Sequence, residues 1–166
     1  NENVLLKQMP FIVGSAIEYE NLKLVPEQYK FLDTCMKTYK DKFPKNQKPT
    51  SFNNKKAICL IYLSLEENGK IPEDVQEDAT EVMNRVPDLI YALYKITMQC
   101  TFLYYQYSGY FEQQAVNKNA IKKLGYNCVK SIIEFSQCAH QSQSWTSSPL
   151  LQLPHFNTDV LRAITK

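Results

Sequence analysis

KKAICLIYLSLEENGKIPEDVQEDATEVMNRVPDLI, residues 55–90, decides the fold class. Its first part predicts a helix over 55–67, ending near Gly69, because apolar side chains recur there at helical spacing. Pro72 and Pro87 each favour the first position of a further helix. The apolar face of the first helix is formed by Ile58, Ile61, Tyr62 and Leu65.

The helix expected from Pro72 is amphipathic. Its apolar stripe comprises Val75, Ala79, Val82 and Val86, and its opening turns carry Glu73, Asp74, Glu77 and Asp78. Carboxylates at a helix start complement the helix dipole. They show no metal-ligand spacing, so we interpret them as a solvent-facing acidic surface.

The rest of the chain also predicts helices, at 3–18, 27–40, 120–140 and from Asn157 or Thr158 onward. Pro10 lies inside the first of these, where we expect a kink or a restart. Loops are expected at 41–54 and 141–148, and a break at 117–119. The sequence therefore predicts an all-α bundle of about six or seven helices without strands. We expect residues 1–148 to form this bundle, and 149–166 to be a linker and the start of a following helical module.

The sequence contains no recognisable catalytic motif. The chain has two histidines, His140 and His155, and lacks the HExxH, GxSxG, P-loop and GxGxxG patterns. Its five cysteines are odd in number and without CxxC spacing, so we expect reduced thiols. The net charge of +2 is too small to indicate a nucleic-acid partner. We expect a non-enzymatic protein without cofactor or metal.

Residues 89–111, LIYALYKITMQCTFLYYQYSGYF, are strongly aromatic. Their length approaches that of a membrane span, but Lys95 and two glutamines interrupt the run. We expect a central helix buried among the others. The alternative is an aromatic docking surface, with Tyr104 and Tyr107 as candidate contact residues.

A basic loop is the second candidate interaction surface. It contains Lys40, Lys42, Lys45 and Lys48, followed by Lys55 and Lys56. Such lysines are often merely solvated, and the alternative is contact with anionic lipid headgroups.

Four segments, in order, resemble the Sec-sixty-three domain family. They are GSAIEYENLKLVPEQ (14–28), the quoted stretch 55–90, EFSQCAHQ (134–141) and SPLLQLPHF (148–156), which a Val-Leu-Arg helix follows. In that family the last motif leads from a helical bundle into a helix-hairpin-helix module and a fibronectin-like module. The chain does not begin with Met, and its last helix is short. We therefore expect it to be part of a longer protein, truncated before those two modules.

Two kinds of protein carry this domain. The resemblance is nearer to the subunit that helps post-translational import of proteins into the endoplasmic reticulum (ER). It implies a parent that spans the ER membrane, whose lumenal J domain, absent here, stimulates a heat-shock chaperone. This part would lie on the cytosolic face as a scaffold for translocation-channel subunits and other translocation factors. The alternative is an accessory domain of a Ski-type RNA helicase.

Overall fold

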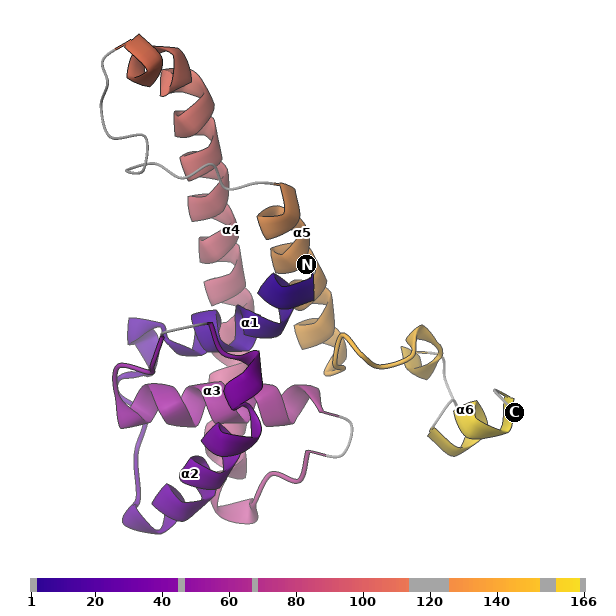
Figure 1. Ribbon diagram of the computed structural model, residues 1–166. Coiled ribbons are helices and arrows are strands. Elements are labelled where there is room, and N and C mark those ends of the chain that lie inside the picture. Colours follow the sequence, from indigo (N-terminus) through magenta and orange to yellow (C-terminus); the bar gives the residue numbers. More distant parts are fainter. Residues whose placement is uncertain (1–2, 45–46, 67–68, 114–125, 153–157, 165–166) are drawn as a thin grey trace.

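Helices form all the regular structure in the described part of the chain (Figure 1). The computed structural model describes residues 3–44, 47–66, 69–113, 126–152 and 158–164. The α-helices are α1 (Asn3–Gly14), α2 (Tyr29–Thr38), α3 (Phe52–Leu65), α4 (Gln76–Gln113), α5 (Tyr126–Gln141) and α6 (Thr158–Ile164). Short 3-10 helices are η1 (Ile17–Tyr19), η2 (Pro26–Gln28), η3 (Lys40–Lys42), η4 (Glu73–Val75) and η5 (Pro149–Gln152). The expected all-α, multi-helix fold is confirmed.

The centre of the bundle is α3. It packs against α1, α2 and α4, and α5 packs against α1 and α4. Every side chain from Ala57 to Tyr62 is buried, so this helix is covered on all sides. The stripe expected on the following helix is also confirmed, since Val75, Ala79, Val82 and Val86 all lie in the core.

The start of α3 is fixed to the end of α1. Ser51 caps α3 by accepting a hydrogen bond from the Asn54 backbone N–H (3.1 Å). The buried Asn54 amide donates to the carbonyls of Gly14 (3.1 Å) and Ala16 (3.0 Å). Gly14 is needed for this approach, because a Cβ there would lie 2.7 Å from Ile58 Cγ1. The two helices therefore cross in close contact.

Proline does not divide the helices as expected. Pro87 lies inside α4, which runs unbroken over 38 residues, so the predicted new helix at this position is wrong. Pro10 likewise lies inside α1 without a restart. In α4 the lost backbone hydrogen bond is offset by core packing on either side of the proline, from Val86 and Ile90. The predicted break at 117–119 lies outside the described residues.

The C-terminal half of α4 extends beyond the bundle. Figure 1 shows α1, α2 and α3 gathered around the first half of this helix, while its second half rises past the end of α5. The α6 helix lies at the opposite side, apart from the bundle, and packs with η5. The protein is thus a compact helical base with a projecting helical arm.

Candidate protein-interaction surfaces

A basic cavity opens beside the C-terminal end of α2. Its volume is about 1090 Å³. The described lining comes from α2, η3, residues 43–44 and 47–49, and the first turns of α3. Four lysines line the cavity, namely Lys37, Lys40, Lys48 and Lys55, together with Asp33 and Asp41. The charged side chains among the described lining residues therefore carry a net charge of +2.

The apolar part of the lining is more buried than three of the four lysines, and we call it the floor of the cavity. It comprises the half-buried residues Met36, Phe43, Pro44 and Pro49. The Phe43 ring is held from behind, with its centroid 5.1 Å from that of Phe11 and 6.1 Å from that of Tyr62. Because those two residues belong to the buried core, the floor is rigidly supported.

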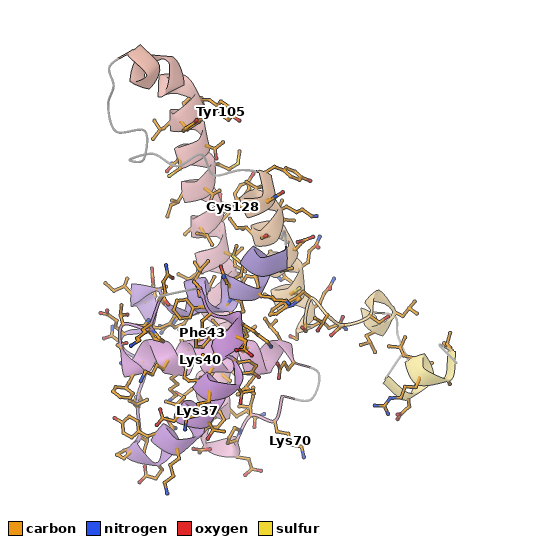
Figure 2. The ribbon with its side chains drawn as sticks, viewed as in Figure 1. Lys37, Lys40, Phe43, Lys70, Tyr105 and Cys128 are labelled. Atoms are coloured by element: carbon orange, nitrogen blue, oxygen red, sulfur yellow. The ribbon has the colours of Figure 1, made fainter. Side chains whose placement is uncertain are left out.

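The structure separates the lysines that the sequence grouped together. Lys40 and Lys48 line the cavity, whereas Lys42 does not, and Lys45 lies outside the described residues. Lys37, which the sequence analysis did not select, joins them because it lies one helical turn before Lys40. Figure 2 shows Lys37, Lys40 and Phe43 close together on the base of the molecule.

Lys56 was wrongly grouped with the basic surface. Its side chain is 0% exposed, and Nζ lies 2.7 Å from Asp78 Oδ2. The ammonium also donates to the Lys23 carbonyl oxygen at 2.5 Å. Asp78, expected on a solvent-facing acidic surface, is instead the partner of this buried charge. The pair joins α3 to the first turn of α4 and is a structural ion pair.

Lys42 faces an aromatic cluster. Its Nζ lies 4.6, 5.4 and 5.7 Å from the ring centroids of Tyr39, Tyr62 and Trp145, and 3.0 Å from Glu66 Oε1. The Tyr39 hydroxyl donates to Glu66 Oε2 at 2.7 Å. Burial and this carboxylate together raise the Tyr39 pKa above its ordinary value. Lys42 therefore holds the chain around Trp145 against the ends of α2 and α3.

An exposed apolar stripe runs along α4 from the part that packs beside α5 onto the projecting half. Tyr91, Met98, Phe102 and Tyr105 are spaced by seven, four and three residues, which places them on one face of a helix. Their exposed fractions are 58%, 43%, 67% and 58%. The expectation that this stretch is buried is therefore wrong for these residues, and the alternative of an aromatic surface fits their exposure.

The stripe continues into a small apolar groove. This groove, of about 260 Å³, lies between α4 and α5. Tyr91 belongs to both, and the opposite wall includes Ile132 and Ile133 from α5. Of the two tyrosines selected from the sequence, Tyr104 is half-buried, and its ring centroid lies 5.7 Å from that of Tyr105 in an edge-on arrangement. The side chain of Tyr107 lies outside the described part of the chain. Stripe and groove together form one apolar surface of the kind that binds proteins.

The described residues hold no obvious reactive centre. The five cysteines are free, as expected. A hydrogen bond with Cys35, together with burial, raises the Cys59 pKa, so its thiol stays protonated and weakly nucleophilic. Within the described ranges no three His, Cys, Asp or Glu side chains gather as metal ligands.

Two further findings concern the membrane and known proteins. Of the helices in the described ranges, none combines the length and hydropathy of a membrane span. Comparisons with protein-family models, curated proteins and solved structures found no match.

Proposed function

We propose that this chain is a non-catalytic scaffold domain of the ER protein-translocation machinery, acting by protein–protein contact at the cytosolic face of the membrane. The proposal starts from the ordered resemblance to the Sec-sixty-three domain family. The observation that carries the contact role is the apolar stripe of Tyr91, Met98, Phe102 and Tyr105 along the exposed face of α4. A helix that exposes large apolar side chains along one face presents a docking surface for another protein.

The shape of the molecule supports a contact role. The stripe runs from the groove beside α5 onto the arm that leaves the base (Figure 1), so that a partner can approach its far end without meeting the rest of the bundle. Aromatic side chains supply large contact areas and are enriched at the centres of interfaces. In the parent protein, translocation-channel subunits or other translocation factors would bind this face.

The test uses the full-length parent with an affinity tag. Cells are fractionated, membranes are solubilised in mild detergent, and co-purifying proteins are identified. We expect recovery with ER membranes and translocation-channel subunits. Recovery in a soluble fraction with RNA and splicing factors would overturn the proposal in favour of an RNA-helicase accessory domain.

A pair of variants tests the stripe itself. Met98→Glu with Phe102→Glu places two charges on the apolar stripe, and Gln99→Glu with Gln106→Glu places the same charges on exposed polar positions that flank the stripe. All four side chains are exposed, so folding should be preserved. We expect the stripe variant to recover at least about tenfold less of the channel subunits. Equal recovery by both variants would remove the stripe from the contact surface.

A further inference from the structure

We propose that the basic cavity beside α2 binds an acidic linear segment of a partner protein, with an apolar side chain of that segment seated on the Phe43 floor. This inference does not depend on the translocation proposal, since it needs only the charge and shape of the cavity. It also differs from the stripe on α4, which is uncharged apart from its neighbour Lys95 and runs onto the projecting arm.

Charge complementarity selects an anionic occupant. Among the described residues no carboxylate forms an ion pair with Lys37, Lys40 or Lys48, although Asp33 and Asp41 line the same cavity. Lys55 is partly engaged, with Nζ 4.0 Å from the Phe52 ring centroid. Three lysines of the lining therefore remain available to carboxylates of a partner.

The spread of the lysines favours several carboxylates over a single compact anion. They come from three separate places: α2, η3 and the chain before α3. Lysine carries a point charge on a flexible stem, without the fixed fork with which arginine grips one phosphate or carboxylate. A chain of Asp and Glu residues presents charges at matching intervals, whereas a single ion can neutralise only one part of this lining.

The apolar floor favours a peptide over a membrane surface. Phe43 and Met36 are half-buried, pack against the core and line a concavity of about 1090 Å³, slightly larger than most ligand sites. A flat layer of lipid headgroups can reach the lysines at the rim but cannot fill that floor. An extended peptide can place one apolar side chain there while its neighbours meet the lysines. Asp33 and Asp41 would then repel segments whose carboxylates fall in the wrong register.

The binding test uses this chain and a fluorescein-labelled peptide in which a Phe-Leu pair is flanked on both sides by acidic residues. Fluorescence anisotropy measures its dissociation constant, which we expect to be about 100 μM or tighter at low salt. Affinity should fall as salt is raised, because exposed charge pairs are screened. A peptide with Ser-Ser in place of Phe-Leu tests the floor without altering the protein and should bind at least about tenfold more weakly.

The protein variants test the lysines of the lining. Lys37→Glu with Lys40→Glu should weaken binding by about tenfold or more, because like charges then face each other. Lys70→Glu with Lys95→Glu is the matched control, because it changes the charge by the same amount: both lysines are exposed, Lys95 lies on α4, and Figure 2 shows Lys70 away from the cavity, in the chain between α3 and η4. Circular dichroism checks that each variant is folded. We expect the control to bind like the unmodified chain.

Three results would overturn the proposal. The first is absence of peptide binding by the unmodified chain. The second is equal affinity for the Phe-Leu and Ser-Ser peptides, or equal losses in the cavity and control variants, which would show charge attraction without a site. The third is sedimentation with phosphatidylserine vesicles that depends on Lys37 and Lys40 while the peptide does not bind, which would assign the lysines to a lipid surface.

Discussion

Removing the carboxylate of Asp78 should destabilise this fold far more than removing its neighbour Glu77. Lys56 is 0% exposed, and Asp78, at 20% exposure, is its only charged partner among the described residues. Deleting one member of a buried pair leaves an uncompensated charge and costs about 3–5 kcal/mol. Because water already reaches part of Asp78, we expect Asp78→Ala to cost about 3 kcal/mol.

Glu77→Ala is the matched control for the position in the helix. Both residues are acidic and lie in the first turn of α4, so each loses its interaction with the helix dipole, worth about 0.3–1 kcal/mol. Glu77 is exposed, and no ion pair of it is seen among the described residues. The difference between the two variants therefore isolates the buried pair.

Lys56→Met tests the asymmetry of the pair. Methionine keeps the apolar stem and removes the ammonium, while the remaining carboxylate is partly hydrated. We expect a cost of about 1–2 kcal/mol, mainly from the lost charged hydrogen bonds. In the Lys56→Met background, Asp78→Ala should cost no more than Glu77→Ala, because no buried charge is left to compensate.

Urea unfolding followed by far-UV circular dichroism gives these free energies of unfolding, provided that the transitions are two-state. Equal costs for Asp78→Ala and Glu77→Ala in the unmodified background would show that the buried pair contributes nothing. A larger cost for Lys56→Met than for Asp78→Ala would show that the burial of an unpaired ammonium is not the source of the loss.

Two further outcomes follow from the packing and from the buried phenols. Gly14→Ala should lower the free energy of unfolding by about 1–3 kcal/mol, because its Cβ would lie 2.7 Å from Ile58 Cγ1; an unchanged thermal midpoint would contradict this close crossing. Burial, the main cause, raises the pKa of Tyr19, Tyr39 and Tyr62 above the ordinary value. Above about pH 10 the unfolded chain loses these protons while the folded chain keeps them, so stability should fall as pH rises. Urea unfolding at successive pH values measures the fall, and a flat profile above that pH would exclude it.

The helical fold could be predicted from local patterns, but the length of α4 could not. Pro72 and Pro87 look alike in sequence, since each precedes acidic and apolar residues typical of a helix start. Only the first lies outside the helix, immediately before η4. At the second, Val86 and Ile90 pack into a core built from other helices, and this packing overrides the local preference. The local sequence around Pro87 gives no information about this packing, so the continuous helix could not be predicted from it.

The same limit applies to the basic residues. Three members of the lysine-rich stretch look equivalent in sequence but have different surroundings in the fold. Lys40 lines a cavity, Lys42 faces an aromatic cluster, and Lys56 pairs with the partly buried carboxylate of Asp78. The continuous apolar run after Lys56 was a usable signal, because a helix that is apolar on all sides is buried. Its partner Asp78 could not be foreseen, since that contact depends on how α4 packs against α3.

The two candidate surfaces are far enough apart to be used at once. Figure 2 shows Lys37 and Lys40 on the base and Tyr105 near the far end of α4. At 1.5 Å per residue, Phe102 and Tyr105 lie about 39 and 44 Å along the helix from its start at Gln76. The first half of the helix is held in the core, where Val82 and Val86 are fully buried. If the two surfaces act independently, altering one should leave the affinity of the other unchanged. Peptide binding to the cavity measured in the Met98→Glu, Phe102→Glu variant tests this, and a change in its dissociation constant would instead show that the two surfaces are coupled.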